Sequence, residues 1–269
     1  MRLDIFLTDN NFFKTRSKAQ LGIKDGIVYV NDKQITKAGF EIGENDKVEI
    51  KGEVLKYVSR GGQKLEKAIS EWNIDLKDKI MIDIGSSTGG FSDVAIQNGI
   101  GKVYAIDVGT DQFDKELAQN PRIHLHENTD FREIDKEVIM DATIVTIDVS
   151  FISVTKIVPK FLELPNIKEI VCLIKPQFEC GAEVASKFKG VIKDENERQN
   201  AVQKIVQAFE EMGYNNIGVI ESPIKGGDGN IEFLAYFVKE GKNVWFAKHG
   251  SNCDFYSYCD FFTVWLVHL

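Results

Sequence analysis

A glycine-rich turn is the first part of this sequence whose composition suits a chemical task. Residues 81–91 read MIDIGSSTGGF, an apolar strand pattern that passes into small residues and then into a helical pattern. Small residues let the backbone approach a ligand closely, and the following helix offers free N–H groups at its N-terminus. The turn therefore predicts a cofactor-binding site.

Two carboxylates stand where a nucleoside needs acceptors. Asp107 closes the next strand pattern, where a carboxylate can accept hydrogen bonds from two ribose hydroxyls. Asp130 follows the third strand pattern, where an adenine amino group would need an acceptor. A dinucleotide dehydrogenase is the alternative, and Asp107 suits either cofactor. The dehydrogenase fingerprint is GxGxxG, however, whereas this chain has Gly85-x-x-x-Gly89-Gly90.

Strand and helix patterns alternate through the part of the chain that contains this turn. We expect strands at 79–84, 102–107, 123–127, 142–148, 169–175, 217–221 and 231–238, and helices at 91–98, 112–118, 153–162 and 195–212. This alternation predicts an α/β, Rossmann-like, doubly wound and mainly parallel sheet, with the last two strands forming an antiparallel edge hairpin. Ligands in such sheets bind beyond the carboxyl ends of the strands, where strand order reverses.

Residues 1–52 form a separate pattern of two short helices followed by strands at 27–33 and 46–50, which predicts a small α+β domain. We assign 53–59 to a linker, 60–240 to the α/β domain and 241–269 to a C-terminal extension of unknown role. The net charge of −8 counts against a nucleic acid partner, so RNA binding depends on local patches. Such a patch is predicted near the start, at Arg2, Lys14, Arg16, Lys18 and Lys24.

Four cysteines without a CxxC pair favour reduced thiols and a cytoplasmic location. The N-terminus does not resemble a secretory signal, and no window before the C-terminal end is apolar enough for a membrane span. Cys253, Cys259, His249 and His268 have spacings that match no standard zinc site, so we predict no metal.

Long motifs give the chain a family resemblance. The runs YVSRGGQKL, MIDIGSSTGGFSDVAIQNGIGKVYAIDVG, TIDVSFIS, LIKPQFE and SPIKGGDGNIEFLAYF resemble the TlyA family of rRNA methyltransferases, historically labelled hemolysins, which share an FtsJ-like ribose methyltransferase core. Residues 1–50 resemble the RNA-binding domain that a small-subunit ribosomal protein shares with pseudouridine synthases and tyrosyl-tRNA synthetases. The resemblance covers about residues 1–240.

The resemblance implies an S-adenosylmethionine site in which Asp107 holds the ribose and Asp130, where the family more usually has Asn, lies near the adenine. The other implied cofactor contacts are Asp83, Gly85, Ser86, Ser87, Thr88, Gly89, Gly90 and Phe91. It also implies RNA contact by the basic residues of the first domain and by Arg60. The implied partner is ribosomal RNA or a ribosomal subunit, and the implied reaction is 2′-O-methylation of ribose, with cytidine as the expected nucleoside.

The family's Lys-Asp-Lys-Glu tetrad has a match at Lys64, Asp148, Lys175 and Glu232. An alcohol does not ionise at neutral pH, so the site needs a base or a charge arrangement that favours an alkoxide. We expect Lys175 nearest the 2′-oxygen, Asp148 orienting its ammonium, and Lys64 and Glu232 positioning the substrate. The alternatives are a non-catalytic RNA-binding or ribosome-assembly factor, which would not need all four residues, and a membrane-lytic protein, for which no insertion segment is evident.

Overall fold

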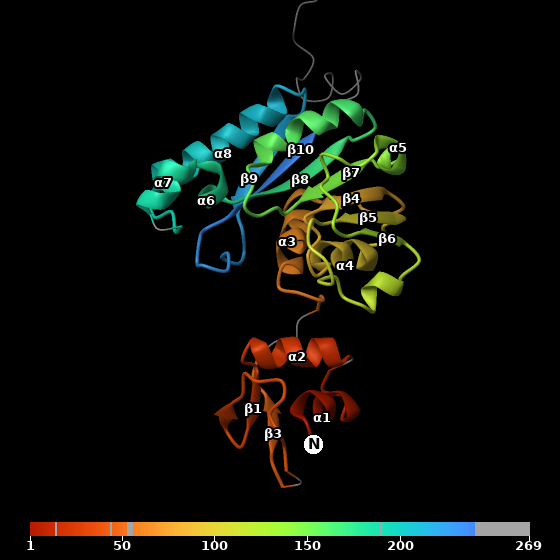
Figure 1. Ribbon diagram of the computed structural model, residues 1–269, viewed down its shortest axis with the longest axis vertical. Helices are drawn as coiled ribbons and strands as arrows, with labels where there is room; N and C mark the ends of the chain where they lie inside the picture. The colour runs from red at the N-terminus through yellow and green to blue at the C-terminus, as the bar shows by residue number, and fades with distance from the viewer. Residues whose placement is uncertain (14, 44, 53–55, 189, 240–269) are drawn as a thin grey trace, which may run out of the picture. The chain divides into compact units, whose positions relative to one another are not determined.

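A computed structural model describes residues 1–13, 15–43, 45–52, 56–188 and 190–239 (Figure 1). Lys14 and the extension at 241–269 lie outside the described residues, as do residues 53–55 of the predicted linker.

The N-terminal domain is a small α+β unit, as predicted. It contains α1 (Leu3–Asp9), α2 (Arg16–Lys24) and an antiparallel sheet in the order β2-β1-β3, with β1 at Val28–Val30, β2 at Lys33–Gln34 and β3 at Val48–Ile50. Leu3 and Leu7 lie four residues apart on one face of α1 and are fully buried in the same core as Ile23 of α2. The Thr15 hydroxyl accepts a hydrogen bond from the Lys18 N–H, which caps α2 at its N-terminus.

The larger domain is built on a seven-stranded sheet in the order β6-β5-β4-β7-β8-β10-β9. Its strands pair in parallel except β10, which lies between β8 and β9 and is antiparallel to both. This confirms the predicted parallel sheet with an antiparallel edge. The strands are β4 (Ile80–Ile84), β5 (Lys102–Ile106), β6 (Ile123–His126), β7 (Ile144–Ile147), β8 (Glu169–Ile174), β9 (Asn215–Glu221) and β10 (Phe233–Val238).

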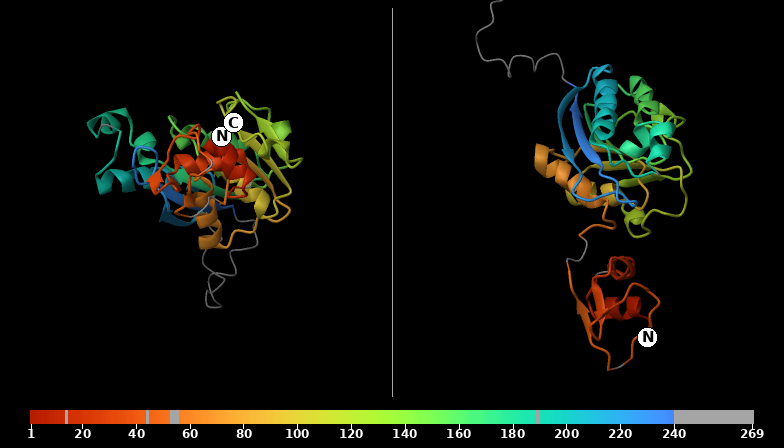
Figure 2. Two further views of the ribbon diagram at one scale, coloured as in Figure 1. Left: turned by 90° about the horizontal axis from the view of Figure 1, so that it is seen from below. Right: turned by 90° about the vertical axis from the view of Figure 1, so that its left-hand side faces the viewer.

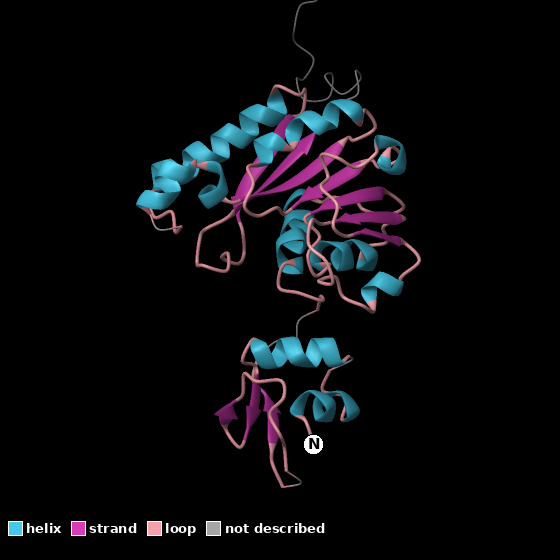
Figure 3. Ribbon diagram, in the orientation of Figure 1, coloured by secondary structure: helices cyan, strands magenta, loops and turns pink. Residues whose placement is uncertain are grey.

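Helices cover both faces of this sheet, as Figure 2 shows for α3 (Gly62–Trp72) and α8 (Glu195–Glu210). Successive residues of a strand point to opposite faces. Met81 accordingly packs in one core with Leu65 of α3, and Ile82 packs in the other core with Phe209 of α8. Figure 3 shows helices on either side of the strands. Both faces of the sheet are buried, which explains why the strands read as near-continuous apolar runs. The remaining α-helices are α4 (Gly90–Gln97), α5 (Lys136–Ile139), α6 (Pro176–Glu179) and α7 (Ala182–Lys187).

Two predicted helices are wrong. In the first, at 112–118, the Asp114 carboxylate accepts the N–H groups of Glu116 and Leu117, and only the short 3₁₀ turn η1 (Leu117–Gln119) forms. The second, at 153–162, forms as two 3₁₀ segments, η2 (Val154–Lys156) and η3 (Val158–Glu163), and Pro159 inside it has no N–H to donate.

A helix at the start of the α/β domain was not predicted from the sequence. We predicted no helix between residues 60 and 79, yet α3 occupies Gly62–Trp72. Tyr57, which we assigned to the linker, is 1% exposed and packs in the same core as Leu65. The side chain of Tyr57 is therefore part of the core of the α/β domain.

The tightest backbone approach in the sheet predicts a stability effect. Gly85 follows β4 with φ +80, and a Cβ added there would lie 2.4 Å from the carbonyl oxygen of Asp148. A left-handed conformation costs a non-glycine residue about 1–2 kcal/mol, before the clash is counted. We expect Gly85→Ala to lower the melting temperature by at least about 2 °C in thermal unfolding, since about 1 kcal/mol shifts the midpoint of a domain of this size by about 2–4 °C.

Gly227→Ala is the matched control, because Gly227 has no positive φ and no atom within 4 Å of the added Cβ. Its unfolding free energy should change by no more than about 0.5 kcal/mol. Equal melting temperatures for the two variants would contradict the close approach at Gly85.

Candidate active site

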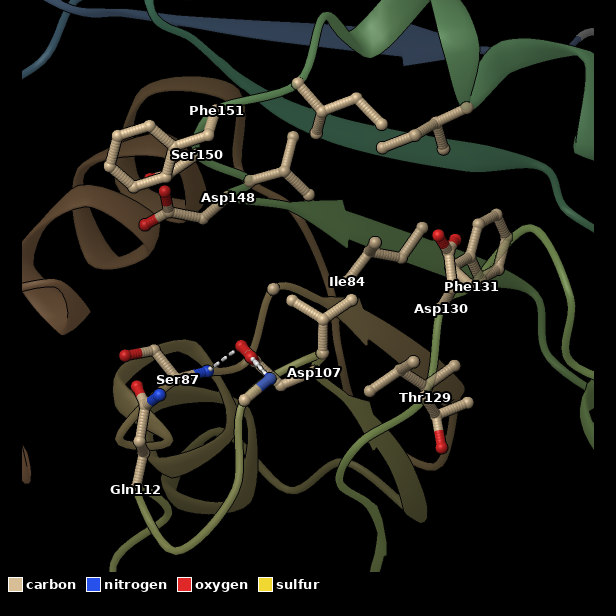
Figure 4. A pocket seen from close by; sticks show the side chains of 17 residues that line it. Ile84, Ser87, Asp107, Gln112, Thr129, Asp130, Phe131, Asp148, Ser150 and Phe151 are labelled. Atoms are coloured by element: carbon tan, nitrogen blue, oxygen red, sulfur yellow. Dashed lines mark hydrogen bonds between the residues drawn. The ribbon is translucent and has the colours of Figure 1, made fainter.

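A cavity lies at the carboxyl ends of the parallel strands, where the strand order reverses. From β4 the chain adds β5 and β6 on one side, then returns to place β7 on the other side of β4. The cavity has a volume of about 370 Å³ and is lined by residues that end or follow these four strands (Figure 4). This is where doubly wound sheets bind ligands, and the volume lies in the usual range of about 300–1,000 Å³ for a small-molecule site.

Asp107 is held rigidly on the cavity wall. Its Oδ2 accepts the Ser87 N–H at 2.8 Å, and its Oδ1 accepts the Gly109 N–H at 2.7 Å. Each carboxylate oxygen has a second acceptor site, so the group can still receive hydroxyl hydrogen bonds from a ligand. The arrangement fits a bound ribose, as the sequence predicted for this residue.

Asp130 lines the cavity across from Asp148, beside Thr129 and Phe131. Arg132 donates hydrogen bonds to both Asp130 oxygens, and these lower the pKa of Asp130. The acid therefore stays ionised as an acceptor at the end of the cavity that would hold the adenine. A mostly apolar wall with acceptors at both positions fits the adenosine part of S-adenosylmethionine.

Two residues of the glycine-rich turn lie on the cavity wall. Gly85 and Ser87 line the cavity. The structure places the other predicted cofactor residues of this region away from the lining: Asp83, Ser86, Thr88, Gly89, Gly90 and Phe91. Gly89 and Gly90 serve packing, since an added Cβ would meet Phe113 and Leu117 at one and Ser59 at the other. Gly89 and Gly90 therefore allow the turn to pack closely against the rest of the domain.

Asp83 in particular is a structural acid. It is fully buried and accepts hydrogen bonds from the hydroxyls of Ser92, at 2.7 Å, and Thr146, at 2.9 Å. Burial raises the pKa of Asp83 to about 6, against the opposing effect of the two hydrogen bonds. Asp83 thereby ties α4 and β7 to β4 beneath the turn.

Four charged side chains from distant parts of the sequence meet at the Asp148 end of the cavity. Lys175 Nζ lies 2.6 Å from Asp148 Oδ1, and Lys64 Nζ lies 2.7 Å from Glu232 Oε2 and 4.0 Å from Asp148 Oδ2. Lys64, Lys175 and Glu232 are at most 9% exposed. The structure thus brings together all four residues of the predicted tetrad, with charges that alternate in sign.

Each member of the tetrad lies at or next to the end of a strand or helix. Asp148 and Lys175 directly follow the neighbouring parallel strands β7 and β8, and Glu232 directly precedes β10, which pairs with β8. Lys64 comes from the first turn of α3, the helix that the sequence did not predict. Parallel pairing therefore sets the Asp148–Lys175 pair, while the antiparallel strand brings in Glu232.

Sequence reasoning missed two residues beside the tetrad. The Lys175 ammonium also donates to Ser150 Oγ at 2.9 Å, and Phe151 lines the cavity while 92% exposed. Phe151 has φ +64, which turns its ring outward, and the ring contacts that of Phe178 with centroids 5.1 Å apart. Both residues lie in the run TIDVSFIS, from which we had selected Asp148 alone.

The basic patch of the N-terminal domain is organised by a buried acid. Asp4 is fully buried and accepts hydrogen bonds from Arg2, Arg16 and Gln20. Burial alone would raise the pKa of Asp4, but these hydrogen bonds hold it well below its usual range. The side chains of Arg2 and Arg16 remain 46% and 51% exposed, so part of each guanidinium faces solvent. Lys24 and Arg60 are exposed, and Lys18 is half-buried.

Within the described ranges, no group of three or more His, Cys, Asp or Glu side chains is arranged to hold a metal ion. No helix among the same residues has the length and apolarity needed to cross a membrane.

Comparisons with known proteins agree with this geometry. Residues 57–239 match the family model described as FtsJ-like methyltransferase, and residues 1–48 match that of the S4 domain. The chain is 44% identical to "Putative rRNA methyltransferase YqxC" of Bacillus subtilis, over 90% of this chain and 86% of that protein. It is 39% identical to "23S rRNA (cytidine-2'-O)-methyltransferase TlyA" of Campylobacter jejuni, over 68% of this chain and 71% of that protein.

A solved structure also matches most of the chain. "Putative hemolysin from Streptococcus thermophilus" superposes with a TM-score of 0.69 at 38% identity, covering 89% of this chain and 88% of that one. Because these matches span most of the sequence, the chain belongs to the FtsJ-like methyltransferase family, in the group that includes the TlyA proteins, and carries an S4 domain at residues 1–48.

Proposed function

We propose that the protein transfers a methyl group from S-adenosylmethionine to a ribose 2′-hydroxyl of ribosomal RNA, with cytidine as the expected nucleoside. The observation that carries this proposal is the meeting of Lys64, Asp148, Lys175 and Glu232 at one end of a nucleoside-sized cavity. The name of the Campylobacter jejuni relative supplies the expected nucleoside and class of RNA.

The cavity residues assign the two ends of the cofactor. S-adenosylmethionine, when bound, supplies an electrophilic methyl group on a positively charged sulfur. Asp107 would accept hydrogen bonds from the ribose hydroxyls and Asp130 from the adenine amino group, while the backbone at Gly85 and Ser87 would allow close approach. Asp148 lines the cavity across from Asp130, so the tetrad lies at the end away from the proposed adenine position.

Lys175 carries out the proton chemistry in this proposal. Once the Lys175 ammonium has released one proton to solvent, Nζ takes the proton of the attacking 2′-hydroxyl, and the Asp148 carboxylate at 2.6 Å stabilises the ammonium that forms again. The Lys64–Glu232 pair neutralises itself and holds the second Asp148 oxygen. Buried charges are costly unless paired, so this arrangement is stable only as a complete set.

The site also offers contacts for the rest of the nucleotide and the RNA. Phe151 presents an exposed ring at the rim, where an unstacked base can stack on it. The exposed guanidinium edges of Arg2 and Arg16 suit phosphate, because arginine can donate several parallel hydrogen bonds. A protein that only bound RNA would have no use for a buried tetrad beside a cofactor cavity.

The direct test incubates the purified protein with labelled S-adenosylmethionine and unmodified large or small ribosomal subunits, then maps any alkali-resistant ribose. We expect the wild type to label one defined ribose and Lys175→Ala to abolish labelling, because the proton acceptor is lost. The Kd of Lys175→Ala for S-adenosylmethionine should be nearly unchanged, as Lys175 is not among the lining residues. The exposed Lys77→Ala serves as the matched control.

Wild-type turnover by Lys175→Ala would exclude the assigned role, and label in a base would exclude ribose chemistry.

Asp107→Ala separates the cofactor assignment from the reaction. Loss of the carboxylate removes both proposed ribose contacts and the acceptor that fixes the Ser87 and Gly109 N–H groups. We expect the Kd for S-adenosylmethionine, measured by calorimetry, to rise by about 10- to 100-fold. An unchanged Kd would show that the ribose lies elsewhere.

Arg16→Ala tests the RNA surface of the S4 domain. One lost phosphate contact should weaken binding to ribosomal subunits and reduce the slope of log affinity against log salt by about one. Lys33→Ala removes the same charge from the exposed strand β2 and should leave that slope unchanged. Identical slopes for both variants would argue against a specific contact at Arg16.

A further inference from the structure

We infer that Ser150 is a positioning residue for methyl transfer: its hydroxyl and the Asp148 carboxylate together fix the orientation of the Lys175 amino group toward the substrate oxygen. This inference rests on the proposed function and adds a residue that lies outside the four-residue charge network. Ser150 contacts Lys175, whereas the reacting atoms are reached by Lys175 itself.

The geometry around Lys175 Nζ requires two acceptors. Asp148 Oδ1 lies at 2.6 Å and Ser150 Oγ at 2.9 Å, and these are its polar contacts within the described residues. A single hydrogen bond would leave the amino group free to rotate about the Nζ–Oδ1 direction. The second bond fixes that rotation. Cε and the two hydrogen bonds then occupy three of the four tetrahedral positions of Nζ, so the fourth position points in one fixed direction. That position holds the lone pair when Lys175 accepts a proton.

The segment that carries Ser150 is fixed at both ends. At its start, the Asp148 N–H donates to the Ile84 carbonyl, and the Asp148 carbonyl packs on Gly85. At its end, the buried Glu179 carboxylate accepts the Val154 N–H at 2.8 Å and the Ser153 hydroxyl.

Between these anchors Phe151 adopts φ +64, a conformation that persists in a non-glycine residue only where its surroundings enforce it. The hydroxyl of Ser150 is therefore presented to Lys175 by a rigid segment.

Ser150 is also a favourable residue to test. Its side chain is exposed, so replacing the hydroxyl with hydrogen creates no core cavity and should leave stability nearly unchanged. Any effect on the reaction then reports on the hydrogen bond. The conservative Ser150→Thr keeps the hydroxyl and should restore the contact.

The experiment measures single-turnover methylation of ribosomal subunits by the full-length protein, together with KM for the RNA and Kd for S-adenosylmethionine. At saturating S-adenosylmethionine, we expect Ser150→Ala to lower the rate by about 10- to 100-fold, the range for a hydrogen bond to a charged group, with KM for the RNA unchanged. Ser150 also lines the cofactor cavity, so the measured Kd separates any change in cofactor binding from the change in rate. Ser150→Thr should recover most of the rate. Ser70→Ala, which removes an exposed hydroxyl from the same helix as Lys64, should match the wild type.

Three results would overturn the inference. A wild-type rate for Ser150→Ala would show that Asp148 alone orients Lys175. A higher KM for RNA at an unchanged single-turnover rate would make Ser150 a substrate contact, and failure of Ser150→Thr to recover the rate would point to local structure. Absence of ribose methylation by the wild type is a separate outcome, which would reject the proposed function and this inference with it.

Discussion

The alternating charges of Lys64, Glu232, Asp148 and Lys175 are the constraint on which the active site depends. Moving a single ionised group out of water costs several kcal/mol, so three side chains that are at most 9% exposed must be paired. Each lysine has an acid within 2.7 Å, and Asp148 links the two pairs because it lies 2.6 Å from Lys175 and 4.0 Å from Lys64. The site therefore forms only when α3, β7, β8 and β10 are all folded in place.

The sheet topology explains how positions so far apart in sequence can be held together. Placing β7 beside β4 brings Gly85 and Asp148 to one cavity at the carboxyl ends of these strands, and the parallel β7–β8 pair carries Asp148 and Lys175 to the same edge. The antiparallel β10 then enters from the opposite direction, so the residue before it, Glu232, arrives at that same edge. In a fully parallel sheet, the residue at this edge would instead follow the last strand, and the chain would first have to return to the opposite edge of the sheet.

The sequence predicted the features that depend on periodicity and on strand ends. Strands buried on both faces are readable as apolar runs, and Asp107, Asp148 and Lys175 could be placed because each follows such a run. The roles of Asp83 and Ser150 could not be predicted, because hydrogen bonds between residues distant in the sequence determine them. Asp83 resembled a ligand-facing acid, yet Ser92 and Thr146 enclose it, and Ser150 acquires its role only when β8 brings Lys175 beside it.

Asp4 shows how an acidic chain can still present a surface for RNA. A net charge of −8 repels phosphate at long range, but salt screens that effect beyond about 8–10 Å. At contact distance the local donors decide, and the two arginines beside Asp4 are held with part of each side chain in solvent. Fixing long side chains before binding reduces the entropy lost when phosphate arrives. An acid that lowers the local charge by one therefore improves the geometry of the remaining donors, and where acidic residues lie matters more than how many there are.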